Sequence, residues 1–219
     1  MTKFVEKESW LGGWYEIEIE LARSSNERLE LALRTVWSHQ SLDGCYLNRD
    51  QEPGLQARVS PPYPATEGHL YGMARLPNGA TTVCGTFVCR FESDGPSASR
   101  DLLALYFPLG SLSKAYPIGG YPFSDAKDAA PWRVELDHWL VNIGEFVYQR
   151  AAFSLALVGF EVDFPNVSSE VIGRTGIPKV RYDGYLWPGA RGLQWYAPTD
   201  FETVKFSQDS SGGGRVNEK

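Results

Sequence analysis

Ser111 and Lys114 have the S-x-x-K spacing of acylating serine enzymes, in which a lysine one helical turn away assists a nucleophilic serine. Such a short pattern arises by chance about once in a chain of this length at average composition. The companion K-T-G and S-D-N signatures are absent from the sequence. Pro117 and the double glycine at 119–120 would also keep any helix here short. We therefore assign no acyl-transfer chemistry to this pair.

Glu135 and His138 have the E-x-x-H spacing found in carboxylate-bridged di-iron sites. Those sites need a second E-x-x-H motif and further glutamates that point into a helical bundle, and this sequence has one such motif. His138 also lies opposite the apolar stripe of its predicted helix. We interpret it as a solvent-exposed histidine, and the sequence predicts no metal or other cofactor.

Three cysteines and three histidines supply the residue types of a Cys–His hydrolase. No local signature of such an enzyme surrounds any cysteine, and Cys45 with His39 is the pair that remains open. Cys84 and Cys89 lie five positions apart on a predicted strand, which directs their side chains to opposite faces. An odd number of cysteines without a disulfide framework predicts buried free thiols and a reducing, cytoplasmic compartment.

The segment from Tyr106 to Phe123 is rich in aromatic residues, proline and glycine. It holds five aromatic residues, three prolines and three glycines between a strand-like run and a predicted helix. Proline and glycine disfavour regular structure, whereas aromatic side chains need burial or a partner. The segment therefore predicts a long, ordered and functional loop. Together with a second aromatic stretch at 182–198, it supplies the candidate binding residues Ser111, Lys114, Tyr116, Tyr121, Phe123, Trp187 and Trp195.

Residues 14–21 alternate between apolar and acidic side chains, which predicts a half-buried strand. The acidic residues Glu16, Glu18 and Glu20 are expected on a solvated face. Successive side chains on one face of a strand stand about 6.6 Å apart, so these carboxylates do not converge as a Ca²⁺ or Mg²⁺ site requires.

The remaining elements are predicted from caps, turns and hydrophobic periodicity. Ser24 and Glu27 form a capping box before a helix that is expected to stop at Asp43-Gly44. Pro77-Asn78-Gly79 is expected to join two extended segments as a hairpin. The other predicted elements are a strand at 101–107, a helix capped by Asp128 or Ala130, a strand buried on both faces at 153–162, and a hairpin of 185–187 with 193–196.

These elements predict an α+β domain, with a single, mostly antiparallel sheet, two long helices packed on one face and a C-terminal hairpin. We expect one domain over residues 1–206 and a disordered tail over 207–219. The net charge of −6 comes without the basic stripe that nucleic-acid binding needs. No apolar stretch has the length of a signal-peptide core or a membrane span, so neither a membrane nor a nucleic acid is expected as a partner.

The missing catalytic signatures, the acidic composition and the aromatic, proline- and glycine-rich loops favour a non-enzymatic binding module. Such a module would dock a protein partner in the cytoplasm through these loops, because tyrosine and tryptophan are enriched at interfaces. Small acidic proteins that neutralise a toxin or a nuclease, as immunity proteins do, have a composition of this kind. The alternative is an enzyme, of undefined reaction, with a small-molecule pocket beneath the 106–123 segment.

Overall fold

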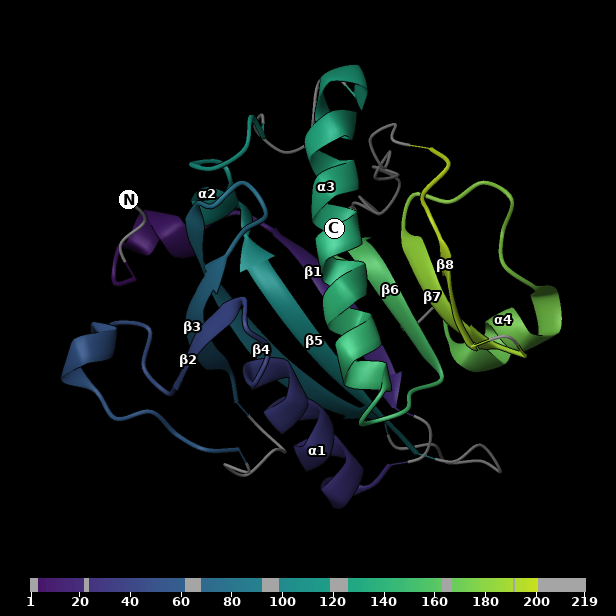
Figure 1. Ribbon diagram of the computed structural model, residues 1–219, viewed down its shortest axis with the longest axis horizontal. Coiled ribbons are helices and arrows are strands. Elements are labelled where there is room, and N and C mark those ends of the chain that lie inside the picture. Colours follow the sequence, from purple (N-terminus) through teal and green to yellow (C-terminus); the bar gives the residue numbers. More distant parts are fainter. Residues whose placement is uncertain are drawn as a thin grey trace, which may run out of the picture.

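An open sheet of eight antiparallel strands forms the centre of the structure (Figure 1). The computed structural model describes residues 4–21, 24–61, 68–91, 99–118, 126–162, 167–190 and 192–200. In spatial order the strands are β2 (Leu42–Tyr46), β3 (Leu70–Arg75), β4 (Thr81–Phe91), β5 (Arg100–Pro108), β1 (Trp14–Leu21), β6 (Leu155–Phe160), β7 (Gly184–Gly189) and β8 (Gly192–Tyr196). The predicted tail at 207–219 lies outside the described residues.

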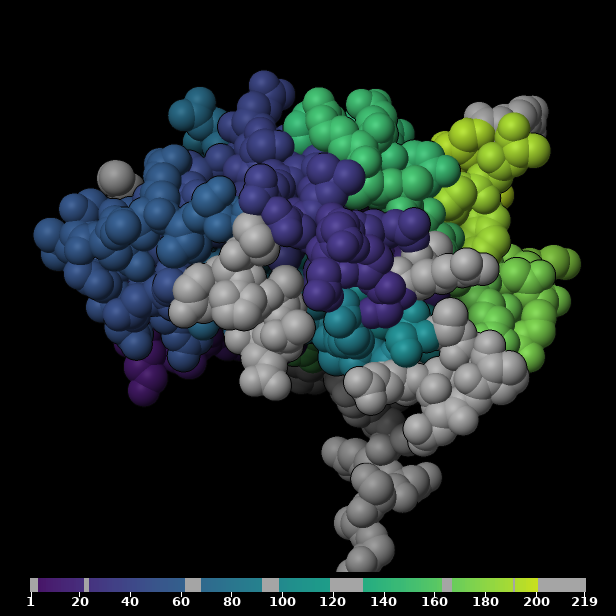
Figure 2. Space-filling view, turned by 90° about the horizontal axis from the view of Figure 1, so that it is seen from below, coloured from purple at the N-terminus to yellow at the C-terminus, as the bar shows by residue number. Residues whose placement is uncertain are grey.

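Two long helices, α1 (Asn26–Trp37) and α3 (Ala126–Tyr148), lie across the same face of the sheet (Figure 1). The shorter helices are η1 (Lys7–Trp10), η2 (Pro53–Leu55), α2 (Leu109–Leu112) and α4 (Ser169–Thr175). Figure 2 shows the segment after β2, in blue, at one end of the molecule and the β7–β8 hairpin with α4 at the other. The predicted α+β class, antiparallel sheet, helix-covered face and C-terminal hairpin are confirmed.

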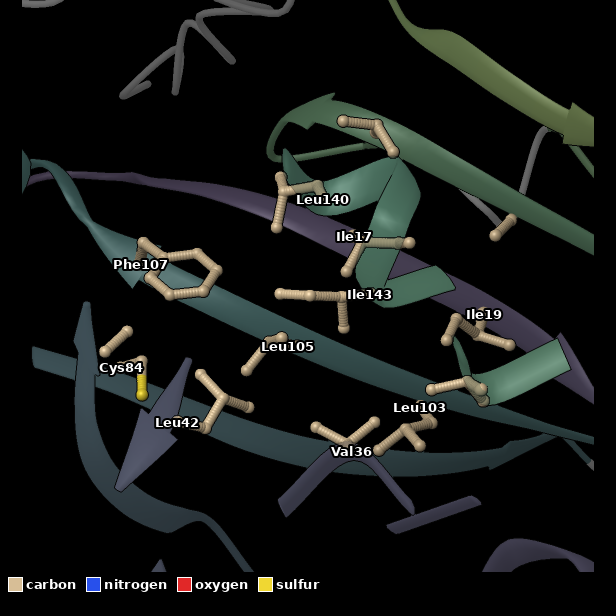
Figure 3. Packing of buried hydrophobic residues seen from close by; sticks show 14 of the residues in the cluster. Ile17, Ile19, Val36, Leu42, Cys84, Leu103, Leu105, Phe107, Leu140 and Ile143 are labelled. Atoms are coloured by element: carbon tan, nitrogen blue, oxygen red, sulfur yellow. The ribbon is translucent and has the colours of Figure 1, made fainter. Parts of the chain in front are cut away.

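The main hydrophobic core lies between the two long helices and the sheet (Figure 3). Its centre comes from β1, where Tyr15, Ile17 and Ile19 are at most 1% exposed. Strand β5 and the two helices close the core around them, because their apolar side chains point to the same space. The predicted stripe of α3 is fully buried here, through Leu136, Leu140, Ile143 and Val147.

The apolar run of β6 is buried on both faces, as the sequence predicts. Ala156 and Val158 join the core beneath α3. Leu155 and Leu157 instead belong to a second cluster on the opposite face, which also contains Ile172 of α4. Strand β6 pairs with β1 on one side and β7 on the other, so an apolar layer above and below it explains its uniform composition.

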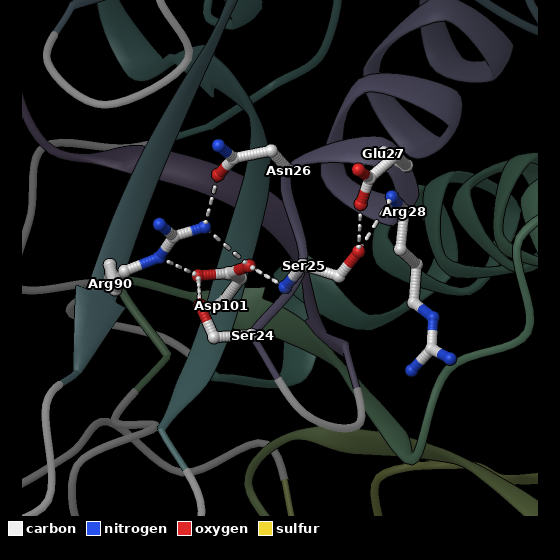
Figure 4. Close-up of polar contacts among 7 residues, drawn as sticks. All are labelled: Ser24, Ser25, Asn26, Glu27, Arg28, Arg90 and Asp101. Carbon is white, nitrogen blue, oxygen red and sulfur yellow. Dashed lines mark hydrogen bonds and ion pairs between the residues drawn. The ribbon is translucent and has the colours of Figure 1, made fainter.

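The N-cap of α1 is one residue later than the capping box predicts (Figure 4). Ser25 Oγ accepts a hydrogen bond from the Arg28 amide at 3.4 Å and donates one to Glu27 at 2.7 Å. Ser24 is withdrawn from the cap because its hydroxyl donates to Asp101 at 2.9 Å. The tertiary partner of Ser24 therefore decides which serine caps the helix.

Asp101 ties the start of α1 to two strands (Figure 4). Its carboxylate accepts hydrogen bonds from Ser24 and from the Ser25 amide at 3.0 Å, and Arg90 of β4 donates to it at 2.6 and 3.0 Å. Burial alone would raise the pKa of Asp101, but the hydrogen bonds from Arg90, Ser24 and Ser25 lower it below its ordinary value. The carboxylate thus remains ionised beneath the helix N-terminus.

Two predicted helix boundaries are wrong. Helix α1 ends at Trp37, and the expected stop at Asp43-Gly44 lies within β2. The positive φ of Gly44, 132°, serves a β-bulge at which the pairing of β2 with β3 shifts register. Helix α3 already begins at Ala126, so Asp128 and Ala130, the predicted caps, both lie inside it.

The acidic face of β1 is buried, which corrects the prediction of a solvated face. Glu16, Glu18 and Glu20 are 2%, 6% and 3% exposed. The Val162 amide donates to Glu16 at 3.0 Å, and the amide and hydroxyl of Ser169 donate to Glu20 at 2.7 and 2.8 Å. The segment after β6 and the start of α4 therefore cover this face. The alternation of residues within β1 could not predict this cover, because these segments are distant in sequence.

Leu140→Ala tests the packing of α3 on the sheet. We expect the free energy of unfolding to fall by about 2–5 kcal/mol, because the substitution leaves a cavity in a close-packed core. Leu31→Ala, at a leucine of α1 that is 45% exposed, is the matched control and should change stability by about 0.5 kcal/mol. Urea denaturation followed by circular dichroism measures both variants. Equal losses in the two would contradict the packing described.

Candidate functional site

Ser111 and Lys114, the S-x-x-K pair, serve separate structural contacts. Ser111 is fully buried, and its hydroxyl accepts hydrogen bonds from Thr82 at 2.8 Å and from the Val83 amide at 3.1 Å. Lys114 instead pairs with a glutamate of the N-terminal segment at 2.8 Å and donates to Ser9 at 3.0 Å. Ser111 thus joins α2 to β4, whereas Lys114 joins the segment after α2 to η1.

The predicted aromatic binding residues lie on both faces of the sheet. Tyr116 is 6% exposed and packs against Trp132 in the core beneath α3. Burial, and then the charge of Glu135, raise the pKa of Tyr116 to about 12. Trp195 also lies on the helix-covered face, whereas Trp187 lies on the opposite one. The structure does not bring these side chains into one site, and Tyr121 and Phe123 lie outside the described residues.

Cys84 and Cys89 point to opposite faces as predicted, but Cys89 is only half-buried, which corrects the expectation that all three thiols are buried. Cys84 belongs to the core beneath the helices and Cys89 to the cluster on the opposite face. Cys45 is buried, and burial raises the pKa of its thiol to about 11. His39 accepts a hydrogen bond from the Ser41 amide at 3.2 Å, so its ring is oriented by the backbone and not by Cys45. A hydrolase built on this pair gains no support from the geometry.

A pocket of about 290 Å³ opens at the end of the sheet where η1, the segment after β2, and strands β1, β3, β4 and β5 meet. It lies on the second face, by which we mean the face opposite α1 and α3. Tyr106 and Pro108 at its floor are buried, its walls are half-buried aromatic rings, and Arg49 and His69 are exposed. The lining residues are Trp10, Trp14, Arg49, His69, Tyr71, Phe87, Tyr106 and Pro108.

The backbone register places the pocket residues. One row of directly paired positions crosses the sheet, from Tyr71 in β3 through Gly85 in β4 and Tyr106 in β5 to Glu16 in β1 and Gly159 in β6. Paired residues of an antiparallel sheet point to the same face, so this row gathers side chains from strands far apart in sequence. The aromatic pocket forms at one end of the row and the buried carboxylate lies at the other side of Tyr106.

Gly85 makes room for Tyr106. A Cβ atom at Gly85 would stand 2.4 Å from the Tyr106 hydroxyl, so the tyrosine ring occupies the space that a side chain would fill. In this position the Tyr106 hydroxyl hydrogen-bonds to Nδ1 of His69 at 2.8 Å. The imidazole in turn stacks nearly parallel to Tyr71, with ring centroids 5.9 Å apart. The glycine thus determines the geometry of the pocket floor.

His69 and Tyr106 carry no formal charge at neutral pH. Burial, and then the positive charge of Arg49, lower the pKa of His69, so the imidazole is neutral. Burial raises the pKa of Tyr106 and keeps the phenol protonated. Burial and the neighbouring charge of Glu18 also raise the pKa of Glu16 well above its ordinary value. Among the lining residues, Arg49 is the one ionised side chain.

A second polar cluster is buried between β1 and α3. Tyr15 donates a hydrogen bond to Asp137, and Arg133 Nε donates to the Tyr15 hydroxyl at 3.1 Å. Arg133 also donates to the Tyr182 carbonyl and lies 4.0 Å from the Asp137 carboxylate. Burial raises the pKa of Asp137 to about 6, although Arg133 and Tyr15 act to lower it. The three groups satisfy one another, which favours a structural role in fixing α3 on the sheet.

Sequence reasoning missed most of the pocket for an identifiable reason. Tyr106 and Pro108 fall in the predicted aromatic loop, but they are the last residues of β5. Trp14 precedes Glu16 by two positions, so it shares the face that was expected to meet solvent. The presence of Trp14 on the same face as three glutamates indicated that other parts of the chain cover this face.

Comparisons with known proteins add no functional information. A scan against protein-family models, a search of curated proteins and a search of solved structures each gave no match. Within the described residues, no helix is both long and apolar enough to cross a membrane. The same part of the chain contains no group of three His, Cys, Asp or Glu side chains arranged to hold a metal ion. The geometry of the pocket therefore carries the functional argument.

Gly85→Ala tests the floor of the pocket. We expect the added methyl group to displace Tyr106, break its hydrogen bond to His69 and cost about 1–3 kcal/mol of stability through overpacking. Gly54→Ala is the control, because a Cβ at Gly54 meets no atom within 4 Å. Urea midpoints give the stability, and the histidine side-chain NMR signals report the broken contact. An unchanged His69 signal in the Gly85 variant would refute this arrangement.

Asp137→Asn tests the buried polar cluster. Because the folded pKa of about 6 lies above the unfolded one, the stability that Asp137 contributes is fully present below about pH 4. It is lost as the pH rises through 6, and amounts to about 2–3 kcal/mol. The variant should remove this fall from the pH profile of the free energy of unfolding. Asp43→Asn, at an exposed ion pair, should retain it.

Proposed function

We propose that this protein is a non-enzymatic binding module that docks a protein partner at the aromatic pocket on the second face. The observation that carries the proposal is the pocket wall. Trp10, Trp14, Tyr71 and Phe87 are only half-buried although they are large and aromatic. Aromatic side chains around a hollow are the usual anchors of interfaces, because they bury much apolar area with few rotatable bonds.

The size of the pocket supports a protein partner. Small-molecule sites usually have volumes of roughly 300–1,000 Å³. At about 290 Å³, this pocket lies at the lower end of that range. A space of this size fits one large side chain from a partner, with the surrounding surface available for further contacts.

The state of the polar groups also favours binding over catalysis. The pocket lining includes no serine, cysteine, lysine or carboxylate side chain. His69 already uses Nδ1 in its hydrogen bond to Tyr106. The serine and thiols considered from the sequence lie elsewhere and have structural partners or raised pKa values. These features support a pocket that recognises a group without transforming it.

The enzyme hypothesis keeps one specific argument, namely that His69 and Tyr106 are hydrogen-bonded to each other inside the pocket at 2.8 Å. A neutral imidazole held by a phenol is an arrangement that general acid–base catalysis could use. This pocket adjoins the start of the 106–123 segment, where the enzyme alternative was expected. The experiment below separates the two functions through the mass of the bound partner.

Photo-crosslinking tests the proposal. A benzophenone amino acid at position 87 should crosslink a protein partner in cells that produce this chain, whereas the same group at the 72% exposed Leu55 should not. The purified protein should then bind that partner. Phe87→Ala should weaken the binding by about 2 kcal/mol or more in calorimetry, and Leu55→Ala should leave it unchanged.

Two results would contradict the proposal. Equal crosslinking from positions 87 and 55 would show that the pocket is not an interface. A partner released with a changed mass would favour the enzyme.

A further inference from the structure

We infer that the group this pocket receives is an aromatic side chain with a carboxylate beside it, the ring between Trp14, Tyr71 and Phe87 and the carboxylate on Arg49. The inference rests on the proposed function and specifies the chemistry of the partner at the point of docking. Three features of the pocket carry it: the shape and composition of its walls, the hydrogen-bonding character of its polar groups and the position of its charge.

The walls select a flat, apolar ring. Rings from η1, β1, β3, β4 and β5 surround the space, and they already contact one another edge to face or tilted. Trp10 meets Tyr71 at 5.3 Å and 83°, while Trp14 meets Tyr106 at 5.7 Å and 51°. An inserted ring can extend this arrangement, because offset and edge-to-face contacts are the favoured geometries between aromatic groups. The neighbouring Tyr106 and His69 side chains are uncharged, so burying an apolar ring against them removes no charged group from water.

The polar groups of the pocket are mostly hydrogen-bond donors. The exposed Arg49 and the half-buried Tyr71 both line the pocket, and neither the guanidinium nor the hydroxyl makes a hydrogen bond to another described side chain. The Trp10 indole nitrogen is occupied, since it donates to the Phe4 carbonyl at 2.6 Å. Free donors without matching acceptors favour a ligand that brings acceptors, and a carboxylate accepts from a guanidinium through two oxygens.

The charge of Arg49 faces the pocket. This residue is exposed, and it forms no ion pair with any described residue. Its positive charge lowers the pKa of His69 and opposes the rise in the pKa of Tyr71 and of Tyr106. Asp50, the next residue in the chain, acts on the pKa of Tyr71 in the opposite direction. The arginine affects three pocket residues, so the rim favours an anion over a cation.

A cationic ligand is the competing possibility, because aromatic faces attract cations. In this pocket a cation would lie near Arg49, and the lining includes no carboxylate that would balance it. The preference between an anion and a cation can therefore be measured directly with matched probes.

The test uses three probes that share one phenylpropyl skeleton: 3-phenylpropionate, 3-phenylpropionamide and 3-phenylpropylamine. NMR titration follows the indole signals of Trp10 and Trp14, with Trp187 and Trp195 as internal controls outside the pocket. We expect the acid to bind about 10-fold tighter than the amide, and the amine to bind most weakly. Arg49→Gln should bring the acid to the level of the amide, and Asp50→Asn should tighten the acid. Arg75→Gln, at an exposed arginine of β3, is the matched control and should change nothing.

Two dipeptides identify the source of the carboxylate. Acetyl-Phe-Asp-amide should bind, because it presents an aromatic ring and a carboxylate as a protein partner would. Acetyl-Phe-Lys-amide should not bind, because it replaces that carboxylate with a cation. Binding of the free acid without the aspartyl dipeptide would overturn this assignment in favour of a small molecule. A preference for the amine, or no shift of Trp10 and Trp14 with any probe, would overturn the inference itself. The crosslinking experiment at position 87 tests the protein-docking function separately, so it can still succeed when the probe titration fails.

Discussion

The pairing of β1 with both β5 and β6 is the constraint on which the rest of the structure depends. It places an N-terminal strand in the middle of an eight-stranded sheet, so both of its faces must be covered. One face supplies the apolar core and carries Tyr15 to the buried contact with Asp137. The other face carries Trp14 and three glutamates. A single alternating strand thus supplies the core beneath the helices and one wall of the pocket.

Buried carboxylates require partners, and this requirement organises the second face. Unpaired charges in the interior cost several kcal/mol, so they are hydrogen-bonded or neutralised. Glu20 is both hydrogen-bonded and ion-paired. It accepts hydrogen bonds from the first residue of α4, and Arg100 lies 3.6 Å from its carboxylate. Glu16 accepts from the Val162 amide and has a raised pKa. The cover over β1 therefore forms around the acidic row, and it leaves the adjacent aromatic end of the sheet open.

The pocket owes its form to absent side chains as much as to present ones. Gly85 leaves the space in which Tyr106 lies. In that space the Tyr106 hydroxyl is hydrogen-bonded to His69, and both groups are uncharged. Specificity must then come from the half-buried rings and from Arg49 at the rim. This division between a fixed floor and an accessible rim is suited to recognition of a partner side chain.

The sequence by itself determined the class of fold, both long helices, the hairpin at Pro77-Asn78-Gly79, the two-sided burial of β6 and the opposite orientation of Cys84 and Cys89. Each of these follows from periodicity or turn chemistry within a single segment. The tertiary structure decided the burial of Glu16 and Glu20, whose backbone partners lie 146 and 149 residues away. It also decided the pocket, which joins short pieces of several strands through their register. Local patterns report which faces of a segment are apolar, but only the folded chain brings together the distant groups that cover a polar face or leave it open.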